Sequence, residues 1–312
     1  VYKRQMFFIE GYQDANVDPL MANGYLEAVK ATGVPLHIWH GQWVHAYPQS
    51  TTTTDLCADK SPCRGDFYES FLLAWLDHWL LGKDTGVLDA PMVQTQGDDG
   101  VWRHETDWPP PGVTKTPFHL SADGKLQTAP TSGSSHYTDI TGDNTEPTSY
   151  TSGTPVEFVS APLTGTLRLT GEVHLETTVT ADAAQGNLVA TLLERKADGS
   201  QRYLSFMAIN LNHVEKLASG DSDVTGKALA ISENFFMQDN IVAAGSTLVL
   251  NIGGLVPTTH TTSGDSSNLL NSGPNIEPVG IGANVTLDLA KTTLTLPVNS
   301  NTTAETIGWK TQ

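Results

Sequence analysis

The 312-residue sequence has little positive charge and no long apolar run. Its 17 Lys and Arg residues stand against 34 Asp and Glu residues, which gives a formal net charge of −17. A chain without a basic stripe has no means of holding a phosphate backbone, so we expect no nucleic-acid partner. No apolar stretch approaches the roughly 20 residues that a membrane-spanning helix needs, and residues 1–5 lack the apolar core of a signal peptide. We therefore expect no membrane partner.

Cysteine is also scarce. Only Cys57 and Cys63 are present, six positions apart in a segment rich in Ser, Thr, Asp and Pro. That span suits a disulfide closing a small surface loop, and the alternative is two free thiols. Together with the abundance of Thr, Ser, Asn and Asp, this predicts a secreted protein, extracellular or periplasmic.

The first part of the chain has the pattern of an α/β protein. The apolar run Met6–Ile9 predicts a buried strand, Pro19–Thr32 a helix that stops at Gly33, and Pro35–Trp39 a second strand. A strand, a helix and a strand with short connections make a βαβ unit, so the two strands should be parallel neighbours. The predicted apolar face of this helix is formed by Met21, Tyr25, Ala28 and Val29.

A second helix is predicted at Phe67–Leu81, ending at Gly82. Its apolar stripe is expected to belong to the core. The stripe consists of Phe71, Trp75, Leu76, Trp79 and Leu80.

Beyond this helix the hydrophobic period changes to that of strands. Residues Leu167–Val179 alternate between apolar and polar side chains, which predicts a half-buried strand. Similar segments separated by turn-rich stretches favour an antiparallel β-sandwich. We therefore predict two domains, 1–89 and 90–312, with the proline-rich segment Trp108–Gly112 as a stiff connector. The similar segments are Leu248–Ile252, Val285–Leu289 and Leu294–Val298.

Candidate catalytic residues follow the two predicted strands of the α/β part. Asp14 lies in the loop after the first strand, and His45 lies 31 positions later, in the loop after the second. The carboxyl ends of parallel strands meet at one edge of the sheet, where ligands and catalytic groups collect. A histidine acting as general base needs a carboxylate that fixes its tautomer and stabilises its imidazolium. Asp14 and His45 are therefore the candidate acid and base, in the chain order of α/β-hydrolases.

Other readings of the same residues stay open. Asp14 suits an ordinary turn, and a glycine-rich loop with one histidine needs no catalytic role. Asp18 is a rival acid that is better placed to cap the helix beginning at Pro19. His40 is a rival base so close to its strand that packing explains it equally well.

The sequence lacks a nucleophile for this pair, because no Gly-x-Ser-x-Gly stands between a predicted strand and a helix. In α/β-hydrolases the serine and the oxyanion-hole donors come from earlier strands. The first ordered element here has the character of a late strand.

Four segments resemble the Xaa-Pro dipeptidyl-peptidase and cocaine esterase family of α/β-hydrolases. Residues 11–14, Gly-Tyr-Gln-Asp, resemble the acid loop of the family, and 41–45, Gly-Gln-Trp-Val-His, its base loop. Residues 75–82 resemble the following helix, and 101–109 resemble the segment that enters the jelly-roll domain of the family. The resemblance implies α/β followed by all-β, the C-terminal part of an α/β-hydrolase sheet joined to a jelly-roll β-sandwich.

The resemblance also implies a function. The complete enzyme would cleave an ester or amide (peptide) bond of a small-molecule or peptide substrate through an acyl-enzyme, with Asp14 as triad acid and His45 as general base. The N-terminal part of the hydrolase domain, which carries the serine in the family, would be a necessary partner, and this chain alone would be inactive. No cofactor and no metal are expected, and the oligomeric state stays open. The aromatic residues near the base are expected to be core and not pocket lining; they are Trp39, Trp43 and Tyr47.

Two alternatives remain. The second domain could be a non-catalytic binding module with Trp102 and Trp108 as exposed stacking platforms, although their place at a domain junction favours burial. The chain could also belong to a catalytically dead relative. Calcium is a lesser alternative at Asp139, Asp143 and Asn144, whose spacing does not fit an EF-hand.

Overall fold

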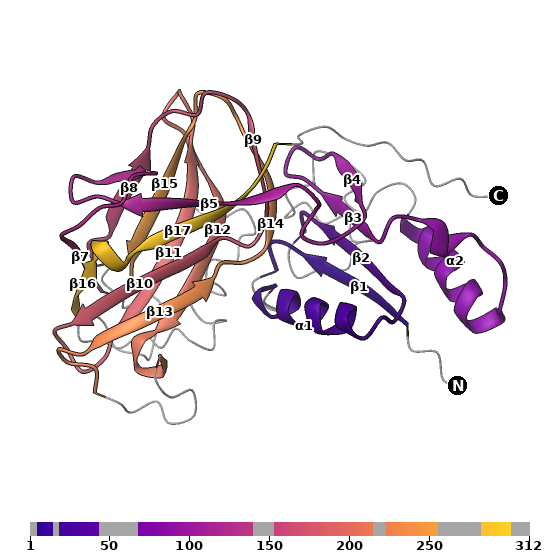
Figure 1. The fold of residues 1–312 in the computed structure, drawn as a ribbon, viewed down its shortest axis with the longest axis horizontal. Helices are drawn as coiled ribbons and strands as arrows, with labels where there is room; N and C mark the ends of the chain where they lie inside the picture. The colour runs from indigo at the N-terminus through magenta and orange to yellow at the C-terminus, as the bar shows by residue number, and fades with distance from the viewer. Residues whose placement is uncertain are drawn as a thin grey trace.

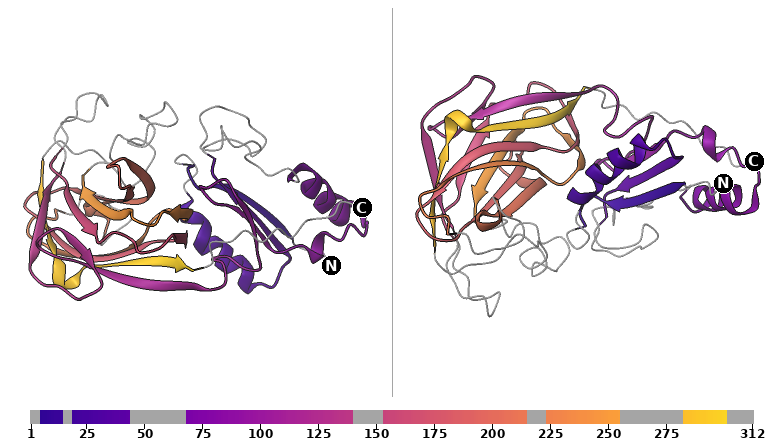
Figure 2. Two further views of the ribbon diagram at one scale, coloured as in Figure 1. Left: turned by 90° about the horizontal axis from the view of Figure 1, so that it is seen from above. Right: turned by 60° about the horizontal axis from the view of Figure 1, so that its bottom comes forward.

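The computed structural model describes residues 5–14, 19–43, 68–139, 153–214, 223–254 and 282–300. A small α/β part lies beside a larger part built from strands (Figures 1 and 2). The predicted fold class, α/β followed by all-β, is confirmed. No helix among the described residues is long and apolar enough to cross a membrane.

The α/β part comprises β1 (Met6–Gly11), α1 (Leu20–Ala31), β2 (Leu36–Gly41), α2 (Tyr68–Leu81), η1 (Val87–Asp89), β3 (Val93–Gln96) and β4 (Trp102–Glu105). The larger part comprises β5 (Val113–Leu120), β6 (Lys125–Gln127), β7 (Ser134–Thr138), β8 (Val156–Ser160), β9 (Leu167–Gly171), β10 (His174–Ala181), β11 (Asn187–Arg195), β12 (Gln201–Asn210), η3 (Leu211–His213), β13 (Ala228–Asn234), β14 (Gln238–Val242), β15 (Thr247–Gly253), β16 (Asn284–Asp288), η5 (Leu289–Lys291) and β17 (Thr293–Asn299).

The first sheet has the strand order β1-β2-β3-β4. β1 pairs parallel with β2 and β2 pairs parallel with β3, whereas β4 returns antiparallel beside β3. The parallel pairing of β1 and β2 across α1 is the predicted βαβ unit. β3 and β4 belong to this sheet although they follow residue 89, and the division of the chain at that residue stays a prediction.

The two helices cover opposite faces of the first sheet. On the α1 side, Leu26 packs with Ile38 of β2 and Val93 of β3. The prediction for the buried face of α1 was wrong: Ala22 and Leu26 are buried, whereas Tyr25 is 50% exposed. Ala22 and Leu26 are buried because they lie against β2 and β3, and the local apolar pattern does not contain the position of that sheet.

Helix α2 packs on the other face and lies at the end of the molecule away from the sandwich (Figures 1 and 2). Phe71 and Trp75 are buried as predicted, against Trp39 of β2. Leu76 and Leu80 were predicted to be core but are 42% and 71% exposed. The described sheet contacts only one side of this helix, so its remaining apolar residues face outward.

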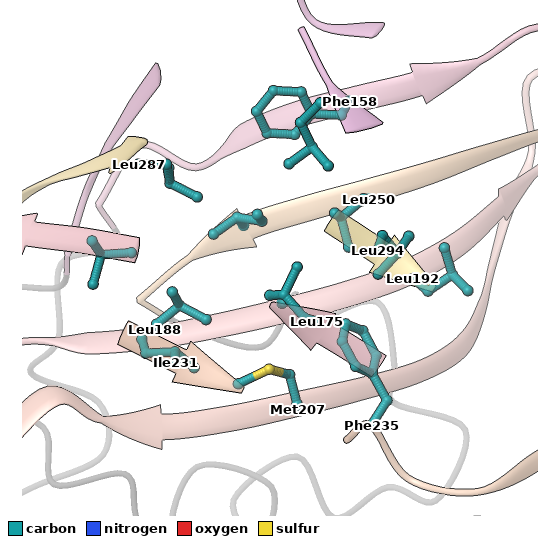
Figure 3. Close-up of a cluster of buried hydrophobic side chains, with 14 of the residues drawn as sticks. Phe158, Leu175, Leu188, Leu192, Met207, Ile231, Phe235, Leu250, Leu287 and Leu294 are labelled. Atoms are coloured by element: carbon teal, nitrogen blue, oxygen red, sulfur yellow. The ribbon is translucent and has the colours of Figure 1, made fainter. Parts of the chain in front are cut away.

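The larger part is a β-sandwich around one core of buried side chains (Figure 3). Its strands pair antiparallel, as predicted, except for the parallel pair β6 and β8. Leu175, Leu192 and Leu250 are fully buried in this core. Along strands such as β10 and β16, alternate residues are buried, which explains why these segments were recognisable from sequence.

The predicted strand Leu167–Val179 is two strands, β9 and β10. Gly171 ends β9 with a φ of 109°, a conformation that L side chains rarely adopt. The side chain of Arg168 on β9 donates to Glu105 of β4, so this face of β9 meets the α/β part. Arg168 of β9, which the alternation placed on a polar face, is consequently 0% exposed.

Candidate active site

The loops that follow β1 and β2 lie side by side. Gly11 and Gly41 are partners in the strand register, and pairing continues beyond both strands. The Tyr12 backbone N–H donates to the carbonyl of Gly41 at 2.9 Å, and that of Gln13 donates to the carbonyl of Trp43 at 3.2 Å. The two segments singled out from sequence as acid loop and base loop therefore run together.

Asp14 is placed and His45 is not. Asp14 is 7% exposed, and its N–H donates to the carbonyl of Gly11 at 3.2 Å, which closes a turn directly after β1. His45 falls in residues 44–67, outside the described residues, so its contact with Asp14 stays a prediction. The last described residue before it, Trp43, is hydrogen-bonded to the neighbour of Asp14.

Trp43 keeps the two strand ends together. Its side chain is 2% exposed and lies against the α-carbons of both Gly11 and Gly41. A Cβ on Gly11 would stand 2.3 Å from the carbonyl oxygen of Trp43 and 2.4 Å from its Cδ1. Glycine at both positions is thus what allows the indole to cover the register pair.

The rival base, His40, packs in the core. Its ring is 0% exposed and lies 5.4 Å from the ring of Tyr12 and 5.0 Å from that of Trp108, centre to centre. Burial lowers the pKa of His40 to about 3, so the ring is neutral at pH 7. The rival acid, Asp18, lies outside the described residues.

A buried chain of polar side chains, missed from sequence, connects the acid loop to the sandwich. Tyr12 Oη and Thr95 Oγ1 are 2.6 Å apart, and Thr95 Oγ1 donates to Asp239 Oδ2 at 3.0 Å. Arg168 donates to both carboxylate oxygens of Asp239, at 2.7 and 2.8 Å, and to Glu105 at 2.8 Å. The chain therefore passes from the loop after β1 through β3 to β14 and β9.

This chain carries shifted pKa values. Burial, followed by the nearby charge of Asp239, raises the pKa of Tyr12 well above its ordinary value, so the phenol stays protonated. Burial alone would lower the pKa of Arg168, but the hydrogen bonds and charges of Asp239 and Glu105 raise it. The only local signal for this chain was the run of polar residues in a buried strand, Val93–Gln96.

The base loop is also bonded to Asp239 of the sandwich. The Gln42 amide donates from Nε2 to the carbonyls of Gln96 at 3.1 Å and of Asp239 at 3.2 Å. Its oxygen accepts from Gln13 Nε2 at 2.9 Å. Gln42 is thus bonded to the acid loop, to β3 and to the sandwich at once.

The aromatic residues follow the predicted burial where the structure describes them. Trp39 and Trp43 are core, and Tyr47 lies outside the described residues. Trp108 is 1% exposed at the junction between the two parts, so it offers no stacking platform to a ligand. Trp102 is half-buried and packs against Trp39, with ring centres 5.4 Å apart.

No group of three or more His, Cys, Asp or Glu side chains among the described residues could hold a metal ion. Asp139, one of the calcium candidates, accepts from the backbone N–H and the side-chain amide of Asn187 at 2.7 and 3.3 Å. The other two candidates, Asp143 and Asn144, lie outside the described residues, as do Cys57 and Cys63.

Comparison with known proteins supports the family resemblance of the four sequence segments. The X-Pro dipeptidyl-peptidase C-terminal non-catalytic domain family matches residues 85–263, more than half of the chain. A putative Xaa-Pro dipeptidyl-peptidase of Streptomyces avermitilis is 26% identical over 210 residues, which are 64% of this chain and 29% of that protein. The cocaine esterase of a Rhodococcus species is 23% identical over 211 residues, covering 57% of this chain and 36% of the esterase.

A solved CocE/NonD family hydrolase from Staphylococcus aureus superimposes with a TM-score of 0.68 at 13% identity. The match covers 96% of this chain and 54% of the solved one. At this identity the match shows the fold, in which both parts are present. The chain thus spans only about a third to a half of the length of the proteins it matches.

Proposed function

Because the chain belongs to the Xaa-Pro dipeptidyl-peptidase and cocaine esterase family of hydrolases, we propose that it supplies the acid and the base of a serine hydrolase. Asp14 is the acid and His45 the general base. One observation carries the proposal: the residue before Asp14, Gln13, donates its N–H to the carbonyl of Trp43, two residues before His45. The chain continues from there in the loop that resembles the base loop of the family.

The reaction is cleavage of an ester or amide (peptide) bond. A serine hydroxyl attacks the carbonyl carbon while His45 takes its proton, and the tetrahedral intermediate collapses with transfer of that proton to the leaving group. Water then attacks the acyl-enzyme by the same route and frees the serine. Asp14 stays ionised, holds the imidazole in one tautomer and stabilises the imidazolium.

The serine is proposed to lie in an N-terminal part of the hydrolase domain that completes the sheet. Two surfaces support this. Among the described strands β1 pairs only with β2, so its other edge is open to a further strand. On α2, Leu73 and Leu80 are 61% and 71% exposed, an apolar surface suited to burial. The chain alone is then inactive.

We further propose that the protein is secreted, with a disulfide between Cys57 and Cys63. Its acidic, Thr- and Ser-rich composition supports this location. The disulfide is tested by alkylating the purified protein with and without prior reduction and measuring its mass. Alkylation of both cysteines only after reduction supports the disulfide, and alkylation without reduction contradicts it.

A fluorophosphonate probe, which labels activated serines, tests the function. The complete polypeptide, expressed with the upstream sequence of its gene, should be labelled, and the 312-residue chain alone should not. Asp14→Asn and His45→Ala should each slow labelling by about three to four orders of magnitude. The matched control is His136→Ala, at an exposed histidine of the sandwich, which should leave the rate unchanged.

Three results would contradict the proposal. Labelling of the chain alone would place the nucleophile within it. Full labelling of His45→Ala would remove its role as base. An unlabelled complete wild-type protein would identify a catalytically dead relative.

A further inference from the structure

We propose that the β-sandwich is part of the catalytic machinery, with Asp239 of β14 as a positioning residue for the acid loop. It acts through Thr95 and Tyr12 on Asp14. The inference rests on the proposed function and adds to it, because the sandwich family is described as non-catalytic.

The direction of the hydrogen bonds is fixed by the charge at one end. The carboxylate of Asp239 only accepts, so the hydroxyl proton of Thr95 is committed to it. Thr95 Oγ1 is then the acceptor for the phenol of Tyr12, at 2.6 Å. Both side chains donate toward Asp239, and each bond polarises the next. The phenol is thereby held in one orientation two residues before Asp14.

Asp239 is itself immobilised. Its two oxygens accept from Nε and Nη2 of Arg168, a bidentate pair in which both side chains are 0% exposed. Arg168 is fixed in turn by Glu105 at the end of β4. A bidentate pair of this kind sets orientation as well as distance.

The main chain of Asp239 serves the base loop. Its carbonyl accepts from Gln42, three residues before His45. One residue of the sandwich therefore holds both loops, the acid loop through its carboxylate and the base loop through its carbonyl. A small displacement of Asp239 would move the proposed acid and base relative to each other, and misplacement by about 1 Å can slow an enzyme about 10²-fold.

A second ionic contact also connects the two parts, but it does not hold the acid loop or the base loop. Arg202 of β12 bonds Asp98, in the turn between β3 and β4, and Glu194 of β11. That cluster connects the same two parts, and the backbone N–H of Asp98 also donates to the Asp239 carbonyl at 3.0 Å, but none of its side chains lies in either loop. Joining the parts thus does not require the Tyr12 to Asp239 chain.

Hydrogen exchange on the 312-residue chain tests the coupling without reference to activity. Thr95→Val removes the hydroxyl at nearly constant shape and should speed exchange at the Gln13 and Asp14 amides about tenfold or more. Thr95→Ser, which keeps the hydroxyl, should restore protection. The matched control is Thr177→Val, which breaks a buried pair of hydroxyls 2.8 Å apart inside the sandwich and should leave these amides unchanged. Equal exchange in Thr95→Val and wild type would overturn the proposal.

Kinetics on the complete polypeptide, with an ester substrate, test the positioning role. Tyr12→Phe and Thr95→Val should each lower kcat about tenfold with KM within about twofold, and the acid limb of the pH profile should move to lower pH as Asp14 holds the imidazole less well. Thr95→Ser should recover kcat. The double variant should lose no more than either single one, because both break the same chain.

Normal kcat in Tyr12→Phe and Thr95→Val, with activity lost in Asp14→Asn and His45→Ala, would overturn the positioning role alone. Retained activity in Asp14→Asn and His45→Ala would overturn the proposed function instead.

Discussion

A Cβ on Gly41 would stand 2.0 Å from Cζ3 of Trp43, so the indole occupies the space that any other residue at position 41 would need. Gly41→Ala should therefore displace Trp43 and destabilise the fold by about 1–3 kcal/mol. It should also slow probe labelling of the complete protein, since Trp43 leads into the base loop.

Gly24→Ala is the matched control for this change. Gly24 lies on the exposed side of α1 with no atom within 4 Å of a Cβ, so alanine should stabilise the helix by about 0.5–1 kcal/mol. Urea unfolding measures both. Equal stability of Gly41→Ala and wild type would show that Trp43 does not lock the strand ends.

Arg168→Met should destabilise the chain by about 3–5 kcal/mol, because it leaves the buried carboxylate of Asp239 and the partly buried carboxylate of Glu105 without their cationic partner. Arg195→Gln is the control, since Arg195 pairs with Glu157 at 2.8 Å where both side chains are partly exposed. That loss should stay within about 1 kcal/mol. Similar unfolding midpoints for the two variants would contradict the burial argument.

Acid should destabilise the α/β part through two buried histidines. Burial, with a smaller contribution from His104, lowers the pKa of His37 to about 3, and burial lowers that of His40 to the same value. Between pH 6.5 and about 3 the unfolded chain binds protons that the folded one does not, so stability falls as pH falls, by up to about 1.4 kcal/mol per pH unit for each histidine.

Urea titrations at pH 7, 6, 5 and 4 measure this slope. His40→Leu removes one titrating group at similar volume and should flatten the curve, whereas His136→Leu, at an exposed site, should leave it unchanged. A curve of unaltered slope in His40→Leu would contradict the prediction.

The outward leucines of α2 should behave differently in the chain and in the complete protein. In the isolated chain, Leu73→Gln with Leu80→Gln should reduce self-association in sedimentation experiments and change stability by less than about 0.5 kcal/mol for each. In the complete protein, where we propose these side chains are covered, each should cost about 1.5–3 kcal/mol.

Leu88→Gln, at another exposed leucine outside α2, controls for a general gain in solubility. Unchanged stability of the complete protein in the α2 double variant would show that this surface is not an interface.

Local pattern sufficed for the βαβ unit, α2 and several strands of the sandwich, and it failed for the faces that distant strands cover. The period of two along β15 and β17 made the sandwich predictable, and Gly82 marked the end of α2. The burial of Arg168 was not predictable, since it depends on Asp239, 71 positions away. Alternation identifies a polar face but not whether water or another part of the protein meets it.

In the candidate site, too, one part was predictable from the sequence and another was not. The consecutive strand, helix and strand predicted that the loops of Asp14 and His45 meet, and the loop hydrogen bonds agree up to Trp43. The contribution of Thr95 and Asp239 could not be predicted, because their contact spans 144 positions and no short motif encodes it.

The position of β3 and β4 bears on how such proteins can be recombined. Both strands lie within the segment that matches the sandwich family, yet both are hydrogen-bonded into the sheet that carries Asp14. A chimera that exchanges this segment between relatives would import two foreign strands into the recipient's sheet, along with Thr95. The recipient would need residues at positions 12 and 42 that fit the imported segment. The two halves therefore cannot be exchanged independently, even where their sequences diverge.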